Sequence, residues 1–240
     1  MFNPKLKVCI AGRNCEKFIE RCFNSISQQS YTNFDLISID DNSSDETYEK
    51  MNLYKKDNWK IIKNSERIGA LNNIVNAINL HNCTDEDVIV LIDADDWLAT
   101  SDAFQILVKY YREGAKATYG SRIVGKDIEV PEGPENISRD WRSNRGNLIH
   151  LHTFMFEIYK HINHDVSFID KETKKYYTSA HDRVIMTNIA ELAGSSIRRI
   201  SEAVYAYNNV NMLSDGYVNR PEQKRIDSIV KNQASYFPLF

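Results

Sequence analysis

The sequence has few cysteines, and they are not arranged to bind a metal or to form a disulfide framework. The four cysteines, Cys9, Cys15, Cys22 and Cys83, include no Cys-x-x-Cys pair. This scatter argues against a zinc ribbon and against a small domain stapled by disulfides. Buried, reduced thiols are the ordinary state of such cysteines, so we expect a reducing compartment and a cytoplasmic protein.

Long apolar runs and a surplus of positive charge are also missing. No stretch of the sequence is apolar and long enough to cross a bilayer, and the segment Met1–Ala11 does not resemble a signal peptide. The net charge is -3 and the isoelectric point is about 6.1, which gives no electrostatic reason to expect a nucleic-acid partner. The sequence therefore predicts a soluble protein with no transmembrane segment, and it leaves the oligomeric state open.

What the sequence does contain is a regular alternation of strands and helices. Its 240 residues, 42% hydrophobic and 26% charged, are enough for one large α/β domain. In the first hundred residues, predicted strands alternate with segments of helical character. This alternation predicts a mostly parallel central sheet flanked by helices on both faces. The predicted strands are Lys5–Ala11, Phe34–Ile39, Trp59–Lys63 and Val88–Ile92.

The second half of the chain has a different pattern. A helix around Phe104–Tyr111 and a strand at Ala117–Val124 lead into a polar segment, Gly125–Asn147, which we expect to be a surface loop. The elements predicted beyond it are an extended segment at Ile197–Tyr207 and helices at Ile149–Ile162, Asp182–Leu192 and Pro221–Asn232.

Three carboxylates follow the fourth predicted strand. The apolar run Val88–Ile92 ends in Asp93, Asp95 and Asp96, and Trp97 comes next. Carboxylates crowded at the end of a buried strand repel one another, and a divalent cation with oxygen ligands relieves that repulsion. Mg²⁺ held by few protein carboxylates usually binds the phosphates of a nucleotide as well. We favour this metal site over an acidic helix cap, for which one Asp would suffice.

A second acidic turn follows the strand Phe34–Ile39. Asp40 and Asp41 precede the serines that can cap the next helix, so capping does not explain them. In an open α/β sheet, ligands bind outside the carboxyl ends of the strands, where both acidic turns lie. A carboxylate there can accept a hydrogen bond from the ring N–H of uracil. We assign this role to Asp41, with ordinary turn chemistry as the alternative.

Five segments together resemble the family 2 glycosyltransferases, which have the Rossmann-like GT-A fold. They are VCIAGRNCEKFI, NFDLISIDDNSSDET, NSERIGALNN, VLIDADDWL and AHDRVIM, and they come in the family's order between about Lys5 and Asp215. The resemblance implies an inverting enzyme that depends on a nucleotide-sugar donor. It further implies a single domain over residues 1–240, with a nucleotide-binding half (about 1–100), an acceptor and catalytic half (about 101–215), and a C-terminal helix and tail (216–240).

The resemblance also implies roles for individual residues. Asp182 would be the catalytic base. Asp95 would bind Mn²⁺ or Mg²⁺, with Asp93 contacting the metal or the ribose, and Asp41 would bind the uracil ring. The other positions that would bind the nucleotide sugar are Ala11, Gly12, Arg13, Arg67, Gly69, Asn73 and Ala94.

The chain departs from the family's usual pattern in three places. Ala11–Arg13 replaces a frequent Pro-x-Tyr, and His181 replaces a common Glu before the base. The segment Tyr205–Ser214 lacks a His that is often a further metal ligand. Asn209, Asn211 or water would take its place.

Inverting sugar transfer needs a base that removes the acceptor's hydroxyl proton while the oxygen attacks the anomeric carbon. Asp182 suits this role because a carboxylate is ionised near pH 7, although its place before an apolar helix also fits an N-cap. Core packing is the ordinary alternative for Trp97, and a structural hydrogen bond is the alternative for His150. The candidate contacts to the acceptor or the sugar are Asp96, Trp97, Trp141, His150 and His181.

The sequence thus predicts a metal-dependent inverting glycosyltransferase. It would move glucose, galactose or an N-acetyl form of either from a UDP-sugar to a hydroxyl group on a glycan or a protein side chain. A nucleotidyltransferase is one alternative, but it usually needs a glycine-rich phosphate loop, which Gly12 and Arg13 scarcely resemble. A non-catalytic module that binds a sugar nucleotide or a glycan is the other.

Overall fold

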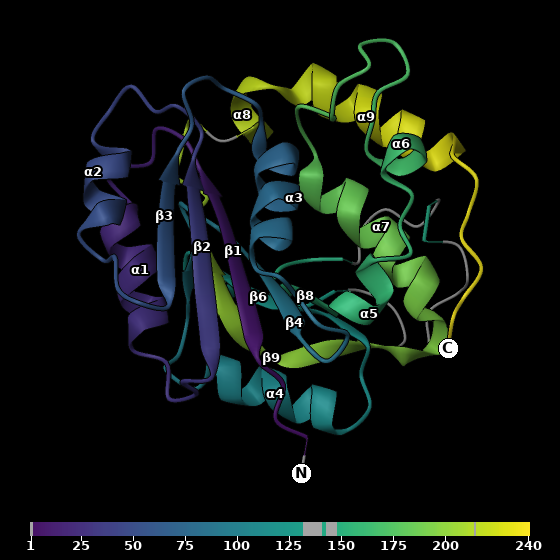
Figure 1. Cartoon of the computed structure of the whole chain (residues 1–240), viewed down its shortest axis with the longest axis horizontal. Coiled ribbons are helices and arrows are strands. Elements are labelled where there is room, and N and C mark those ends of the chain that lie inside the picture. The colour runs from purple at the N-terminus through teal and green to yellow at the C-terminus, as the bar shows by residue number, and fades with distance from the viewer. Residues whose placement is uncertain (1, 132–140, 143–147, 214) are drawn as a thin grey trace.

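The computed structural model describes residues 2–131, 141–142, 148–213 and 215–240. In these residues the chain forms one nine-stranded sheet with helices on both faces (Figure 1). Its strand order is β3-β2-β1-β4-β8-β6-β9-β5, with β7 beside β6. The strands are β1 (Leu6–Gly12), β2 (Phe34–Asp40), β3 (Trp59–Lys63), β4 (Val88–Asp93), β5 (Trp97–Leu98), β6 (Ala117–Val124), β7 (Asp127–Glu129), β8 (His152–Met155) and β9 (Ile197–Tyr207).

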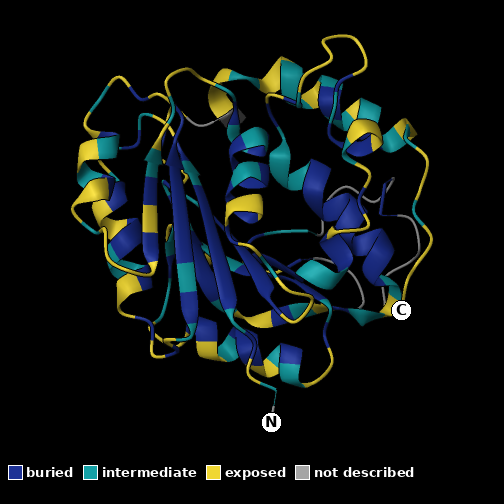
Figure 2. Ribbon diagram, viewed as in Figure 1, coloured by how far each residue is buried: buried dark blue, intermediate teal, exposed yellow. Residues whose placement is uncertain are grey.

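The helices divide between the two faces of the sheet, and each group covers its own hydrophobic cluster. On one face lie α1 (Ile19–Ser27), α2 (Thr47–Asn52) and α4 (Ala103–Arg112). On the other lie α3 (Ala70–Leu80), α5 (Phe156–Tyr159), α7 (His181–Ala193) and α9 (Arg220–Asn232). Along β1, Val8 faces the first cluster and Cys9 the second, as the alternation of side chains in a strand requires. The strands β1, β2 and β4 are therefore buried on both sides, as Figure 2 shows.

The first four strands, β1 to β4, form a parallel half of the sheet. Leu6 pairs with Phe34 of β2 and with Val88 of β4, and Leu36 pairs with Trp59 of β3. This register brings the carboxyl ends of β1, β2 and β4 to one edge of the sheet. The predicted α/β architecture, a mostly parallel sheet flanked by helices, is confirmed, and the acidic turns after β2 and β4 lie at the same edge.

The prediction of one helix over Ile149–Ile162 is wrong for most of its length. The structure has the strand β8 there, antiparallel to β4 and β6, followed by the short helix α5. Because β8 is buried on both faces, its four residues lack the alternation of buried and exposed positions that distinguishes a strand from a helix. The consequence is functional, because β8 brings His150 to the carboxyl end of β4.

The remaining predictions concern the loop and the C-terminus. Most of the loop predicted at Gly125–Asn147 lies outside the described residues, and its described part includes β7. Beyond β9 come α8 (Asp215–Val218) and α9, and the tail returns along α7, where the Leu239 amide donates to the carbonyl of Leu192 (2.9 Å). The other short helices are α6 (His164–Ser167) and a 3-10 turn at Gly194–Ser196.

Among the described residues, no helix combines the length and the apolar composition that a membrane span requires.

Candidate functional site

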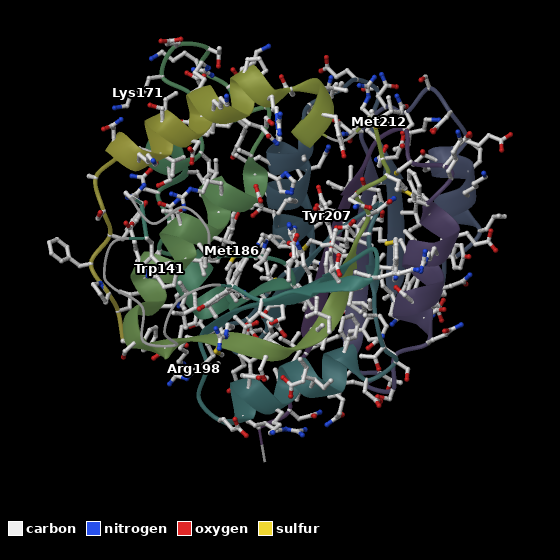
Figure 3. All side chains as sticks on the ribbon, turned by 180° about the vertical axis from the view of Figure 1, so that it is seen from behind. Trp141, Lys171, Met186, Arg198, Tyr207 and Met212 are labelled. Atoms are coloured by element: carbon white, nitrogen blue, oxygen red, sulfur yellow. The ribbon has the colours of Figure 1, made fainter. Side chains whose placement is uncertain are left out.

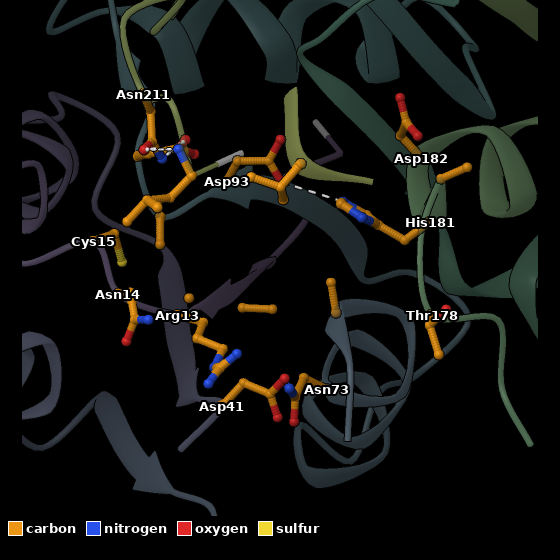
Figure 4. Close-up of a pocket in the computed structure, with 18 of the residues that line it drawn as sticks. Arg13, Asn14, Cys15, Asp41, Asn73, Asp93, Thr178, His181, Asp182 and Asn211 are labelled. Atoms are coloured by element: carbon orange, nitrogen blue, oxygen red, sulfur yellow. Dashed lines mark hydrogen bonds and ion pairs between the residues drawn. The ribbon is translucent and has the colours of Figure 1, made fainter. Parts of the chain in front are cut away.

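A cavity of about 530 Å³ opens beyond the carboxyl ends of β1, β2 and β4 (Figure 4). Carboxylates from three distant segments line it: Asp41 after β2, Asp93 and Asp95 at the end of β4, and Asp182 in the first turn of α7. The predicted site residues that the structure brings together in this wall are Ala11, Gly12, Arg13, Asp41, Arg67, Asn73, Asp93, Ala94, Asp95, His150, His181 and Asp182.

The end of β1 forms the floor of the cavity. At Gly12, this floor has no room for a side chain. A Cβ atom at Gly12 would lie 2.7 Å from the Cβ of Ala94 and 2.7 Å from the Cε of Met51. The Gly12 carbonyl also accepts a hydrogen bond from the Asp41 amide (2.8 Å), which joins the floor to the turn after β2. A glycine here lets the backbones of β1 and β4 approach each other beneath a ligand.

Asp41 is buried in the cavity wall and holds the loop before α3. Its Oδ1 accepts hydrogen bonds from the Ile68 amide (2.8 Å) and from the Asn64 side chain (3.1 Å), and its Oδ2 accepts one from the Gly69 amide (2.9 Å). Gly69 has a φ of 90°, a left-handed conformation that few other residues adopt readily. Gly69 therefore acts behind the wall, by orienting Asp41, and does not line the cavity itself.

Asp93 lies between two histidines. Its Oδ1 is 3.2 Å from Nε2 of His181, and its Oδ2 is 3.6 Å from Nε2 of His150 (Figure 4 shows the first of these). Burial alone would raise the pKa of Asp93, but the two imidazoles hold that pKa well below its ordinary value. Burial lowers the pKa of His150. Asp93 is therefore ionised at pH 7.

Asp95 has different surroundings. Its Oδ2 accepts a hydrogen bond from the side-chain amide of Asn211 (2.7 Å). Burial and the charge of Asp93 raise the pKa of Asp95 to about 6. A cation beside this pair would favour the ionised form of both carboxylates, so the donor set suits a hard divalent ion. In the described part of the chain, no group of three or more His, Cys, Asp or Glu side chains is placed to hold a metal, so phosphate or water would have to complete its coordination.

The start of α7 brings Asp182 to the cavity. Ala180, the residue before the helix, has a φ of 54°, and this left-handed turn directs His181 and Asp182 to the cavity wall. Although burial by itself raises the pKa of Asp182, the neighbouring His181 and His150 hold it below its ordinary value. Asp182 is therefore ionised at neutral pH, as a base must be before it accepts a proton.

Three residues predicted to contact the acceptor or the sugar lie elsewhere. Asp96 is buried, and its Oδ1 accepts from the Asn208 amide (2.7 Å), so it joins the turn after β4 to the end of β9. Trp97 belongs to β5, and the Arg21 guanidinium covers its ring at 3.4 Å. Trp141 is buried in the core with its ring edge-on to Tyr119. None of these three side chains is part of the cavity wall that the described residues form, and each is engaged by packing or by a backbone partner.

Several residues of the cavity wall were not predicted from the sequence. Arg122 of β6 and Tyr207 of β9 meet in a cation–π contact at 4.3 Å, and both line the cavity. No motif signals them, because their positions depend on how β6 and β9 pair. The other missed wall residues are Asn14, Cys15, Thr178, Ala180, Leu213, Val218 and Gln223.

Comparison with known proteins identifies the family and the fold. Residues 7–174 match the family model described as Glycosyl transferase family 2. The structure of S. aureus TarS 1-349 in complex with UDP superposes with a TM-score of 0.69 at 18% identity, covering 97% of this chain and 67% of that one. The mannosyltransferase PcManGT from Pyrobaculum calidifontis, in complex with GDP-Man and Mn²⁺, gives a TM-score of 0.64 at 14% identity, covering 97% and 66%. These likenesses confirm the GT-A fold.

Three relatives with curated names align with different shares of this chain and of their own length. The WfaP protein of Escherichia coli, named UDP-Glc:alpha-D-GlcNAc-diphosphoundecaprenol beta-1,3-glucosyltransferase, is 28% identical over 52% of this chain and 49% of its own length. A GalNAc(5)-diNAcBac-PP-undecaprenol beta-1,3-glucosyltransferase of Campylobacter jejuni is 28% identical over 52% of this chain and 40% of its own. An uncharacterized glycosyltransferase of Haemophilus influenzae is 22% identical over 98% and 74%. The chain thus aligns with less than half of either glucosyltransferase.

Proposed function

The chain belongs to glycosyl transferase family 2 and is a glycosyltransferase, and from this premise we propose that it transfers a sugar from a UDP-sugar to a hydroxyl group with inversion at the anomeric carbon. One observation carries the proposal: Asp41, Asp95 and Asp182, from three distant segments, line a single cavity at the carboxyl edge of the sheet. Within one cavity, Asp41 offers a contact for the uracil ring, Asp95 a ligand for a metal ion and Asp182 an acceptor for the proton of the attacking hydroxyl group.

The donor half of the cavity suits a uridine diphosphate. Asp41 accepts three hydrogen bonds from protein groups and, as a carboxylate, has lone pairs left for a ring N–H. Arg13 and Arg67 add positive charge to the same wall, where a diphosphate needs it. The name of the E. coli relative, which specifies UDP-Glc, and the UDP complex of TarS support this donor class.

We assign the metal to Asp95 with Asp93, as Mn²⁺ or Mg²⁺. Asp95 is the better ligand of the two, because Asp93 is already engaged by His150 and His181. A bound divalent ion would stabilise the charge that develops on the departing diphosphate. The Mn²⁺ complex of PcManGT supports a metal of this kind.

Asp182 is our candidate for the general base. It is ionised at neutral pH and lines the same cavity as the metal-binding pair. In an inverting transfer it takes the proton of the acceptor hydroxyl while that oxygen attacks the anomeric carbon from the side opposite the leaving diphosphate. Arg122 and Tyr207 lie in the part of the wall formed by β6 and β9, where the acceptor would bind.

The acceptor we propose is a hydroxyl group of a glycan. The names of both glucosyltransferase relatives specify glycans on an undecaprenyl diphosphate. We further propose that residues of about 1–100 bind the donor and those of about 101–215 bind the acceptor, within one domain.

A screen of UDP-glucose, UDP-galactose and their N-acetyl forms with Mn²⁺ tests this function. We expect one of them to release free UDP in the presence of the chain, slowly with water and faster with a glycan acceptor. Chelation of the metal should abolish the release. Release of pyrophosphate, or no consumption of any UDP-sugar, would contradict the proposal.

A further inference from the structure

Apolar side chains are exposed in the segment that follows β9. Val210 is 69% exposed and Met212 is 66% exposed, and Leu213, Tyr217 and Val218 are exposed to a similar degree. We refer to these five residues as the rim patch, because Leu213 and Val218 also line the cavity. A group of exposed apolar side chains on a globular protein usually marks a contact surface. The rim patch places such a surface at the mouth of the cavity.

Five exposed cations lie on α9 and on the loop attached to it. Three come from the loop between α6 and α7 and two from α9, and all five are exposed: Lys171, Lys174, Lys175, Arg220 and Lys224. We call these residues the basic cluster. In the described part of the chain, none of them has an ion-pair partner.

The nearby acidic side chains are engaged by a different cation. Asp170, Glu172 and Glu222 each contact the guanidinium of Arg225. Arg225 offsets one of these three negative charges, and the five cations of the basic cluster exceed the other two, so net positive charge remains at this surface.

The rim patch and the basic cluster lie on the same side of the molecule. The ion pair of Asp170 with Arg225 and the hydrogen bond of Thr178 with Glu222 attach the lysine-bearing loop to α9. The rim patch leads through α8 directly into α9. Figure 1 shows α8, α9 and the loop along one edge, and Figure 3 shows Lys171 and Met212 at that same edge from behind.

We propose that the rim patch and the basic cluster dock on an anionic lipid bilayer and hold the mouth of the cavity against a glycan acceptor anchored there by a lipid. Apolar side chains insert at the boundary between headgroups and acyl chains, while lysine and arginine are attracted to anionic headgroups. The two features have complementary roles, because neither five apolar side chains nor five cations alone anchor a protein firmly. Binding to the bilayer does not depend on the reaction, whereas the assignment of a lipid-anchored glycan as acceptor rests on the proposed function.

Sedimentation with lipid vesicles tests the docking. The full chain should sediment with vesicles of phosphatidylcholine containing about 30% phosphatidylglycerol, and the bound fraction should fall as salt screens the charges. It should sediment much less with phosphatidylcholine alone. The variant K171E/K174E/K175E and the variant V210S/M212S should each lower partitioning by about tenfold or more.

A matched control separates the rim patch from general hydrophobicity. Leu53 is 83% exposed at the end of α2, and Leu53→Ser should leave partitioning unchanged. Circular dichroism of each variant verifies that it is folded. No sedimentation of the wild-type chain with anionic vesicles, or equal sedimentation of V210S/M212S and the wild type, would overturn the proposal.

The two proposals fail separately. UDP release from a UDP-sugar in water, without vesicles, reports the reaction alone, and V210S/M212S should retain it. If the wild type releases UDP but does not bind vesicles, only the docking is wrong. If it binds vesicles but releases no UDP from any UDP-sugar, the docking stands, whereas the proposed function and the lipid-anchored acceptor that rests on it are wrong.

Discussion

The side-chain amide of Asn211 donates a 2.7 Å hydrogen bond to Oδ2 of Asp95, joining the segment after β9 to the turn after β4. Asn211 is itself held in place, because its Oδ1 accepts from the Leu213 amide (3.0 Å). Asn211→Ala should therefore leave the carboxylate of Asp95 without its partner. We expect the Mn²⁺ concentration for half-maximal UDP release to rise by about tenfold, as is typical when a partner of a metal ligand is lost.

Asn209→Ala is the matched control for this variant. Asn209 is exposed two residues away and makes no side-chain hydrogen bond in the described structure. Its substitution should not change the metal requirement. An unchanged requirement in Asn211→Ala would show that Asp95 does not depend on this contact.

Asp41→Asn should weaken both the fold and the nucleotide site. An amide in place of the carboxylate directs an NH₂ group at the backbone N–H of Ile68 or Gly69. The loss of one such buried hydrogen bond should lower the free energy of unfolding by about 2 kcal/mol in a urea titration. UDP affinity, measured by calorimetry, should fall by about tenfold.

Asp57→Asn removes the same charge from an exposed position and serves as the control for Asp41→Asn. It should change neither quantity. If Asp41→Asn binds UDP as tightly as the wild type, Asp41 has no part in recognising the base.

Much of the fold and part of the site followed from the sequence because parallel strands place their carboxyl ends together. The apolar run Val88–Ile92 and the strand Phe34–Ile39 each predict a buried strand, and each is followed by acids. Once the strands are parallel, Asp41 and Asp95 must come to the same edge. This reasoning needs only periodicity and topology.

The sequence could not predict contacts that depend on tertiary pairing. His152–Met155 has the composition of a helix or a buried strand, and only its position between β4 and β6 decides for the strand. Trp141 lies among polar neighbours in the sequence but packs against Tyr119 from another element. Arg122 and Tyr207 meet only because β6 and β9 are adjacent. Local patterns carry no information on such partners.

Gly12→Ala should destabilise the chain because its methyl group would overlap two neighbours. The contacts of 2.7 Å to the Cβ of Ala94 and the Cε of Met51 predict a loss of about 1–3 kcal/mol in the free energy of unfolding. The double variant G12A/A94G removes one of these contacts and should recover part of the loss. Additive effects of the two substitutions would argue against this close approach.

Stability should fall in mildly acidic solution because of His81. Its Nε2 lies 3.1 Å from the Val8 carbonyl, and burial lowers its pKa from 6.5 to about 4. The unfolded chain therefore binds a proton more readily than the folded one between these values. His81 costs no stability above pH 6.5, and the fold loses up to about 3 kcal/mol from this residue as the pH falls to 4.

Urea titrations at several pH values measure this loss. His81→Gln should flatten the decline between pH 6.5 and 4, whereas substitution of the exposed His161 by Gln should not. A decline that is equally steep in His81→Gln would assign the acid sensitivity to other groups.

The rate of UDP release in Asp182→Asn, measured beside UDP affinity, tests the proposed reaction most directly. The amide has nearly the same shape as the carboxylate but cannot take a proton from the acceptor. We predict that release with a glycan acceptor falls by about 100-fold or more, while UDP affinity stays within about twofold of the wild type. Release at the wild-type rate in Asp182→Asn would contradict the assignment of the base and, with it, the catalytic account of this cavity.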